Sequence, residues 1–218
     1  MKFRTENEIT FIFNNDCNQL ILDKLKELEV SYSVKFTNKT ILEIYINTAE
    51  YFKEKFVVSK NGQFFEGKYI TKKLIPNSNV MSYTENSISK WEPFIFNGIS
   101  TNCIILKRKT QLLTNSGYVI TFTELLNPTI PERKYYYVEI ESRELFSPDN
   151  SIVNILYNVM QTTGGHELTV ADSKISKCKM HTTFIPLSSY QDVIEFFNKY
   201  SACERDDALL WINKQKNV

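Results

Sequence analysis

In the run Glu6-Asn7-Glu8-Ile9-Thr10-Phe11-Ile12-Phe13, polar and apolar side chains alternate from Glu8 to Phe11. Successive side chains of a strand point to opposite faces, so a strand over residues 5–13 would carry its two glutamates and Thr10 on one face. The apolar residues at the odd positions would lie on the other face. This pattern predicts a strand that packs on a core with one face and presents carboxylates with the other.

A second Glu-x-Glu pair, Glu139-Ile140-Glu141, ends a strand predicted over 134–141. Residues two apart on a strand share a face, so each pair presents two carboxylates together. Taken singly, each pair also fits a solvated face of an antiparallel sheet. If the two strands close one barrel, however, four carboxylates would share a cavity and repel each other. Mg²⁺ or Mn²⁺ would relieve this repulsion, because these ions prefer oxygen ligands. The predicted metal ligands are therefore Glu6, Glu8, Glu139 and Glu141.

Between these two strands the chain reads mainly as β structure. A helix over 17–29 follows the first strand and has Asn15 and Asp16 as candidate caps. Turn signals such as Asn61-Gly62 separate the later candidate strands. The predicted strands are 31–36, 41–46, 51–58, 63–70, 92–97, 102–110, 118–124 and 134–141. The expected fold is α+β and mainly β, a closed antiparallel eight-stranded tunnel-like barrel with flanking helices, with a β-sandwich as the alternative.

The last third of the chain has a different pattern. A helix is predicted to start after 147–150 and to stop at Gly164-Gly165. A strand near 180–185, a helix ending near Tyr200 and a short final helix are predicted beyond it. The expected organisation is a tunnel domain over 1–165 and a C-terminal strand and helices over 166–218 that pack on it.

Composition excludes several classes of protein. With 26 basic and 25 acidic residues the net charge is only +1, so any polyanion site must be local. The 4 cysteines form no CxxC pair and only 2 histidines are present, which argues against a zinc ribbon or a disulfide scaffold. There is no apolar signal region and no apolar run long enough to span a membrane. We therefore expect no membrane association and a reducing, intracellular location.

Basic side chains in the β region could neutralise bound phosphates. Lys53 and Lys55 would share one strand face, as would Lys107 and Lys109. Lys107 and Arg108 cannot both face inward on a regular strand, and the sequence does not decide between them. Each residue taken alone also fits an ordinary surface position. The candidate substrate-binding residues are Lys53, Lys55, Lys68, Lys73, Lys107, Arg108 and Lys109.

With both glutamate pairs, the chain resembles the metal-dependent RNA triphosphatases of mRNA capping, the triphosphate tunnel family of fungi, microsporidia and large DNA viruses. The run 6–11 resembles the family's first glutamate motif, and Tyr137-Val138-Glu139-Ile140-Glu141 resembles its last. Phe52-Lys53-Glu54-Lys55-Phe56 and Lys107-Arg108-Lys109 are similar to its basic strands. The resemblance covers about residues 5–145.

The resemblance implies removal of the γ-phosphate from the 5′ end of nascent RNA with Mg²⁺ or Mn²⁺, in the nucleus or at a cytoplasmic site of viral transcription. The four glutamates would be catalytic as well as metal-binding, because one could orient the attacking water. The implied partner is 5′-triphosphate RNA. No Lys-x-Asp-Gly motif of a guanylyltransferase is present, so either a separate guanylyltransferase partner or a longer chain with a downstream domain is expected.

Two other functions fit the same residues. A tunnel could hydrolyse inorganic polyphosphate or nucleoside triphosphates, since these substrates need the same carboxylates and bases. A barrel could also be a non-catalytic subunit of a transcription or processing complex. The enzyme interpretations require that the glutamate pairs do not face solvent.

Overall fold

The computed structural model describes residues 3–49, 52–61, 64–75, 81–88, 103–126, 135–144, 146 and 151–168. In chain order their elements are β1 (Phe3–Phe13), α1 (Asn18–Glu27), β2 (Tyr32–Ala49), β3 (Phe52–Asn61), β4 (Phe64–Leu74), β5 (Met81–Ile88), β6 (Cys103–Thr114), β7 (Val119–Leu126), β8 (Tyr135–Ser142), α2 (Ser151–Thr162) and β9 (His166–Glu167). The described part is therefore mainly β.

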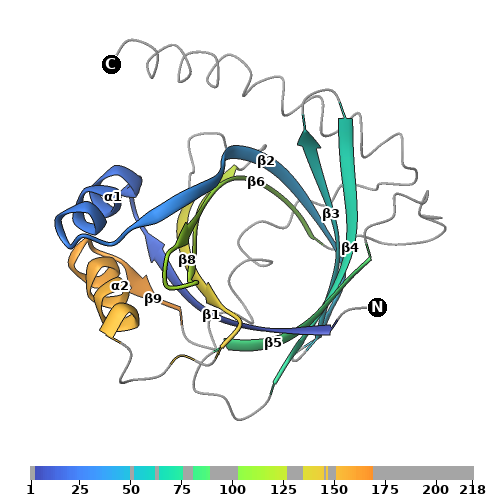
Figure 1. Ribbon diagram of the computed structural model, residues 1–218. Coiled ribbons are helices and arrows are strands. Elements are labelled where there is room, and N and C mark those ends of the chain that lie inside the picture. The colour runs from blue at the N-terminus through green and yellow to red at the C-terminus, as the bar shows by residue number, and fades with distance from the viewer. Residues whose placement is uncertain are drawn as a thin grey trace.

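The strands form one antiparallel sheet in the order β5-β4-β3-β2-β6-β7-β8-β1-β9. β1 pairs with β8 along one side over Asn7–Phe13 and with β5 along the other side over Phe3–Glu8. The sheet therefore curls until its two ends meet at β1, as Figure 1 shows. The prediction of a mainly β antiparallel fold with flanking helices is confirmed. We call the inner surface of the curled sheet the concave face and the outer surface the convex face.

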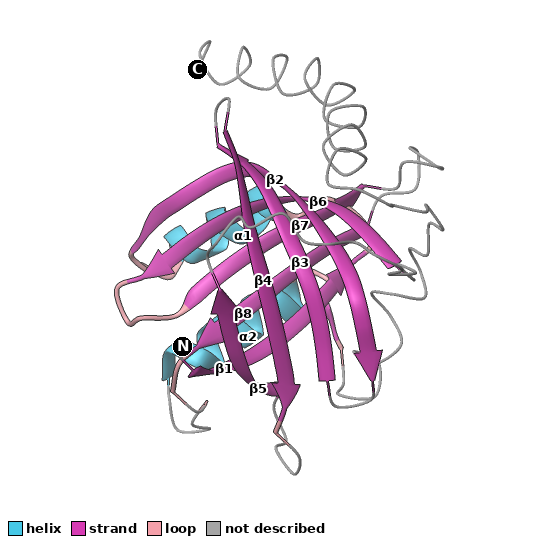
Figure 2. Ribbon diagram, turned by 90° about the vertical axis from the view of Figure 1, so that its right-hand side faces the viewer, coloured by secondary structure: helices cyan, strands magenta, loops and turns pink. Residues whose placement is uncertain are grey.

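The hydrophobic core lies on the convex face, under the two helices. Figures 1 and 2 show α1 and α2 against the outside of the sheet. Phe11 is fully buried there and meets the ring of Tyr157 from α2 edge-on at 5.2 Å between centroids. The core is built from alternate residues of the strands and from the inner sides of both helices: Ile9, Phe11, Phe13, Ile21, Leu25, Leu112, Ile120, Phe122, Val138, Ile140, Val153, Leu156 and Val159. Burial of this apolar area is the main stabilising term of the fold.

The start of α1 and the end of α2 lie close to the predicted positions. At the start of α1 the side chain of Asp16 accepts a hydrogen bond from the backbone N–H of Asn18 at 3.0 Å. At the end of α2 Gly164 has φ +91°, which favours glycine. A Cβ on Gly165 would lie 2.6 Å from the ring of Phe13, so this close approach of backbone to core requires a second glycine. Gly164-Gly165 is therefore a helix stop, as predicted.

Two features of the sheet differ from the sequence analysis. The predicted strands 31–36 and 41–46 are one strand, β2, in which Asn38 has φ +48° and the register shifts between Phe36 and Lys39. An irregularity within a strand can thus have the sequence pattern of a turn. β5 lies where no strand was predicted.

The part of the chain after α2 returns to the sheet. His166 and Glu167 pair with Ile12 and Phe11, and the N–H of Leu168 donates to the carbonyl of Thr10 at 2.8 Å. The predicted division at 165/166 remains a prediction, because residues 169–218 lie outside the described part, as does the predicted strand 92–97. Within the described ranges, no helix has the length and apolar character needed to cross a membrane.

Candidate functional site

Both glutamate pairs lie on the concave face. β1 and β8 are neighbours, and their register sets Glu8 opposite Glu141. Three of the four side chains are buried, with 8% of Glu6, 7% of Glu8 and 5% of Glu139 exposed. Their strand neighbours Ile9 and Ile140 belong to the core on the convex face. The structure thus brings together the carboxylates that the alternation in the sequence predicts, and it buries them.

Lysines from two other strands pair with these carboxylates. Lys72 of β4 lies 2.7 Å from Glu6 and 3.8 Å from Glu8. Lys109 of β6 lies 3.2 Å from Glu139. The two glutamate pairs therefore form part of a mixed charged surface, in which buried cations and anions are close enough to compensate each other's desolvation.

A further carboxylate, Glu43 of β2, lies between two lysines on the same face. Its Oε1 is 2.6 Å from the Nζ of Lys107 and 2.9 Å from the Nζ of Lys55. Burial alone would raise the pKa of Glu43, but Lys107, Lys55 and Lys109 outweigh burial and hold this pKa well below its usual range. Burial and the neighbouring lysines lower the pKa of Lys107 to about 7, although Glu43 opposes this shift. This cluster has more basic than acidic groups and is suited to an anion.

Glu141 is in the opposite electrostatic situation. Burial, together with the nearby carboxylates of Glu6 and Glu139, raises the pKa of Glu141 to about 8. Its Oε1 accepts a hydrogen bond from the hydroxyl of Thr121 at 3.4 Å, and Thr121 in turn accepts one from Gln111 at 3.1 Å. The region around Glu141 therefore has an excess of negative charge that a cation or a proton would relieve.

The predicted basic residues fall on both faces of the sheet. Lys107 and Lys109 are on the concave face, as the ion pairs with Glu43 and Glu139 require. Arg108 lies on the convex face, where its guanidinium donates to Glu124 at 3.0 Å beside α1. The strand alternation that turns its two neighbours inward turns Arg108 outward, away from the concave face, and its assignment as a substrate-binding residue stays a prediction.

The remaining predicted lysines lie on β3 and β4. Lys55 is on the concave face, paired with Glu43. Lys68 shares the side of Lys72 by strand alternation but is exposed. Lys73 is also exposed, and its odd offset from Lys72 sets it on the other side of β4, so its assignment as a substrate-binding residue stays a prediction. Lys53 pairs in register with Lys72, but its side chain lies outside the described part.

Several concave-face residues were not predicted as site residues. Glu43 stands in the apolar run Ile41-Leu42-Glu43-Ile44, where one acidic residue interrupts a strand. Such an interruption is a usable signal, because a buried carboxylate needs a charged partner. Lys72 could have been chosen over Lys73 by its even spacing from Lys68 and Ile70, which puts these three residues on one side of β4.

The oxygen-rich donor set of the glutamate pairs matches the preference of Mg²⁺ and Mn²⁺. The burial of Glu141 beside the carboxylates of Glu6 and Glu139, which raises its pKa, is a second feature that fits a divalent cation. In the described ranges, no group of three or more His, Cys, Asp or Glu side chains is gathered closely enough to hold a metal ion. The carboxylates are instead tied to lysines, so a cation would have to replace those ion pairs.

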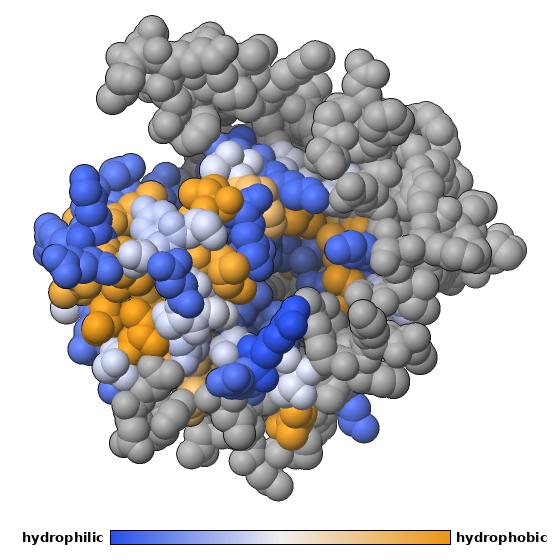
Figure 3. All heavy atoms as spheres, viewed as in Figure 1, coloured by the Kyte–Doolittle hydropathy of each residue, from blue (hydrophilic) through white to orange (hydrophobic). Residues whose placement is uncertain are grey.

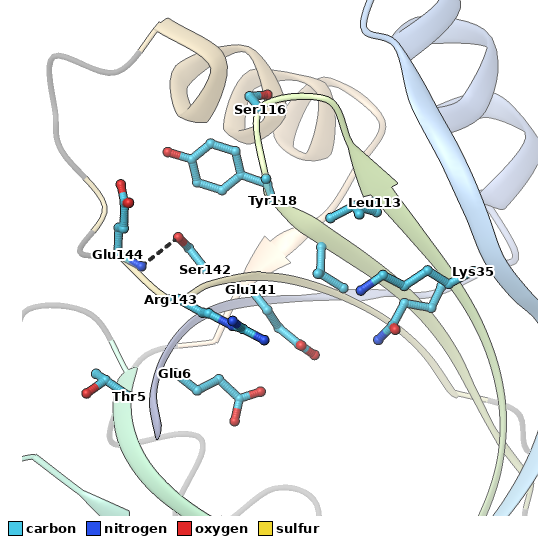
Figure 4. A pocket seen from close by; sticks show the side chains of 13 residues that line it. Thr5, Glu6, Lys35, Leu113, Ser116, Tyr118, Glu141, Ser142, Arg143 and Glu144 are labelled. Atoms are coloured by element: carbon cyan, nitrogen blue, oxygen red, sulfur yellow. Dashed lines mark hydrogen bonds between the residues drawn. The ribbon is translucent and has the colours of Figure 1, made fainter. Parts of the chain in front are cut away.

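A cavity of about 490 Å³ opens at the end of the concave face nearest Glu6 and Glu141. Figure 4 shows these two carboxylates and the guanidinium of Arg143 pointing into the same space, with Lys35 reaching in from the far side. In Figure 3 a hollow at the centre of the molecule contains hydrophilic residues. The cavity volume falls in the range of small-molecule sites.

Comparisons with known proteins give a likeness of fold. No model of a known protein family matches the chain, and no curated protein sequence matches it. The protein PH1012 from Pyrococcus horikoshii OT3 superposes with a TM-score of 0.51 at 16% identity, over 73% of this chain and 90% of that one. PH1819 from the same organism gives a TM-score of 0.50 at 14% identity, over 74% and 92%.

A weaker likeness is to the S. pombe Pct1 RNA triphosphatase. Its TM-score is 0.37 at 11% identity, over 73% of this chain and 75% of that one. A superposition of this quality does not bear on chemistry.

Proposed function

We propose that this protein is a metal-dependent phosphohydrolase that removes the terminal phosphate of a triphosphate inside a closed triphosphate tunnel. One observation carries the proposal: the concave face gathers buried glutamates together with buried and half-buried lysines from six strands. Burying so many charges is costly, and a core needs none of them. Such a costly arrangement is typical of a functional site.

The lysines on the concave face are suited to hold the phosphate chain. A polyphosphate carries several negative charges, and a terminal phosphoryl group gathers more on its oxygens and the leaving group as it departs. Lys55, Lys107 and Lys109 converge on one part of the face. When the substrate binds, its phosphate oxygens would replace part of the ion pairs that these lysines make with Glu43 and Glu139.

The two glutamate pairs would hold the divalent cation. Glu6, Glu8, Glu139 and Glu141 are the proposed ligands, directly or through water. The cation would supply charge neutralisation at the phosphates and a site for the attacking water. Glu141, whose pKa is about 8, is also suited to exchange a proton near neutral pH.

The finer proposal is that the substrate is the 5′ triphosphate of nascent RNA, in the first step of cap formation, with a guanylyltransferase acting next. It is supported by the two glutamate motifs on adjoining strands. An inorganic polyphosphate or a nucleoside triphosphate would use the same lysines and carboxylates.

Release of phosphate by the wild-type protein tests the proposal. The substrates are triphosphate-ended RNA, ATP and inorganic triphosphate, each with Mg²⁺, with Mn²⁺ and with EDTA. We expect metal-dependent release that EDTA abolishes, with RNA preferred if the protein acts in capping. Absence of release from all three substrates by folded protein would contradict the proposal.

A non-catalytic role is the second candidate. It is favoured by the ion pairs that tie Glu6 to Lys72 and Glu139 to Lys109. A surface whose charges already compensate each other can be purely structural. Binding of inorganic triphosphate without hydrolysis would support a binding subunit, and absence of binding would support a structural role.

A further inference from the structure

Two buried threonines on the concave face hold two of the four glutamates. The hydroxyl of Thr10 donates to Oε1 of Glu8 at 2.7 Å, and the hydroxyl of Thr121 donates to Oε1 of Glu141 at 3.4 Å. Thr10 is 1% exposed and Thr121 is fully buried. Buried hydroxyls need a hydrogen-bond partner, and in both cases that partner is a carboxylate. These bonds restrict the orientation of the two glutamate side chains.

The register of three strands explains why both threonines reach the same place. Thr10 of β1 and Thr121 of β7 both lie opposite Glu139 of β8. Glu8 and Glu141 lie opposite each other in the next row of the same face, two residues along each strand. Each hydroxyl therefore reaches from the row of Glu139 into this next row. The two carboxylates that face each other across β1 and β8 are thus each bonded to a hydroxyl.

The other glutamate of each pair lies against a lysine. Glu6 is 2.7 Å from Lys72 and Glu139 is 3.2 Å from Lys109, while Lys72 is 3.8 Å from Glu8. An ammonium group repels an approaching divalent cation, whereas an uncharged hydroxyl does not. An ionised carboxylate has several lone pairs, so a hydrogen bond from a hydroxyl leaves acceptor sites for a metal ion. A hydroxyl can therefore hold a metal-binding carboxylate in place without competing with the cation for it.

A third side chain orients one of the two hydroxyls. The amide of Gln111 on β6 donates to the hydroxyl oxygen of Thr121 at 3.1 Å, and the two residues lie opposite each other in the register of β6 and β7. Because the hydroxyl oxygen accepts this bond, its own proton is directed to Glu141. Gln111, Thr121 and Glu141 therefore form a chain of hydrogen bonds across three neighbouring strands.

We propose that Thr10 and Thr121 are positioning residues for a divalent cation, which orient Glu8 and Glu141 before the cation binds. The contribution of Thr10 is the larger one, because a hydroxyl–carboxylate bond of 2.7 Å is strong and one of 3.4 Å is long. Loss of a side chain that orients a metal ligand typically weakens metal binding by about 10- to 100-fold. This inference rests on the proposed function, because it assumes that Glu8 and Glu141 bind a cation.

Two substitutions at Thr10 separate the hydroxyl from the packing of the side chain. Thr10→Val keeps the shape and removes the hydroxyl, whereas Thr10→Ser keeps the hydroxyl and removes a methyl group. A packing role would be damaged more by serine, and a hydrogen-bonding role more by valine. Thr123→Val is the matched control. Thr123 is 5% exposed on the same face of β7, and its hydroxyl has no hydrogen-bond partner among the described residues.

Calorimetric titration of the protein with Mn²⁺, in the absence of substrate, measures the effect on the cation. We expect the Kd for Mn²⁺ to rise about 10-fold or more in Thr10→Val and about threefold in Thr121→Val. The Kd should stay within about twofold of the wild type in Thr10→Ser and Thr123→Val, because neither change removes a hydroxyl that is bonded to a carboxylate. An unchanged Kd in Thr10→Val and Thr121→Val, or an equal rise in Thr10→Ser and Thr10→Val, would overturn the positioning role. A wild-type protein that does not bind Mn²⁺ would contradict the proposed function itself.

The Mn²⁺ dependence of phosphate release is a second measurement on the same variants. In Thr10→Val the Mn²⁺ concentration that gives half of the maximal rate should rise about 10-fold, because the oriented carboxylate is lost before the cation binds. The rate at saturating Mn²⁺ should stay within about threefold of the wild type, since the bound cation itself then orients Glu8. A lower rate at saturating Mn²⁺ with an unchanged Mn²⁺ dependence would overturn the role of Thr10 toward the cation.

Discussion

The concave and convex faces of this sheet are made by the same strands and yet have opposite chemistry. On β1, Phe11 is in the core under the helices, whereas Glu8, three residues before it, is on the charged face. On β7, Phe122 packs in the core and Thr121 bonds to Glu141. The convex face would be stable without the concave one, since apolar burial needs no charged partner. Apolar burial does not require the concave charges, and matched substitutions on the two faces test how the faces differ.

The largest effect is expected on the convex face. Phe11→Ala removes a fully buried ring and leaves a cavity, so unfolding should become easier by about 3–5 kcal/mol. Leu20→Ala, at a position that is 50% exposed, is the control and should change stability by no more than about 0.5 kcal/mol. Denaturant titration measures both. A loss below about 1 kcal/mol for Phe11→Ala would show that this face is not the core.

The next effect compares neighbours on β6. Lys109→Ala removes a concave cation paired with Glu139, and phosphate release should fall about 100-fold. Arg108→Ala removes a cation from the convex face, where it pairs with Glu124, and should leave the rate within about twofold. Initial rates at saturating substrate test the pair. Equal losses in the two variants would contradict the division of the faces.

The smallest expected effect is a pH dependence of the protein's stability that arises from Glu141. The pKa of Glu141 is raised from 4.5 to about 8 in the folded protein, so between these values the folded state holds a proton that the unfolded chain releases. The stability associated with this proton is present below pH 4.5 and is lost as pH rises to about 8. Glu141→Gln cannot ionise and avoids the loss.

Thermal unfolding should therefore show that Glu141→Gln has a higher Tm than the wild type at pH 8. This gain in Tm should be about 2–4 °C larger at pH 8 than at pH 5, which corresponds to a difference of roughly 1 kcal/mol in unfolding free energy for a protein of this size. Glu144→Gln, at an exposed position nearby, should show no such trend. A gain that did not grow with pH would mean that Glu141 is not held protonated by its neighbours.

Much of the fold was predictable because its signal is local. The alternation in β1, the glycine stop after α2 and the strand at Tyr135–Ser142 all follow from a short window of sequence. β5 was missed because Met81–Ile88 is largely polar and shows no apolar face. β2 was split because its irregularity at Asn38 resembles a turn.

The site was predictable only in part, because it depends on which strands become neighbours. The two glutamates of each pair are two residues apart, so the sequence alone predicts that their side chains share a face of the strand. The three consecutive basic residues at 107–109 do not show by their spacing which of them face inward. The core contacts of the flanking strands decide which face each one takes. Glu43 and Lys72 could not be assigned partners, since the partners lie on other strands. Arg143 and Lys35 depend on a strand end and a bulge that no alternation predicts.

The proposed function places the removal of phosphate from triphosphates at the concave face. The most direct test compares Glu139→Gln on this face with Glu124→Gln on the convex face, measuring Mn²⁺-dependent phosphate release from triphosphate-ended RNA and from ATP. The account predicts a loss of at least about 100-fold in kcat for Glu139→Gln, and a rate within about twofold of the wild type for Glu124→Gln. Full activity in a folded Glu139→Gln protein would contradict it.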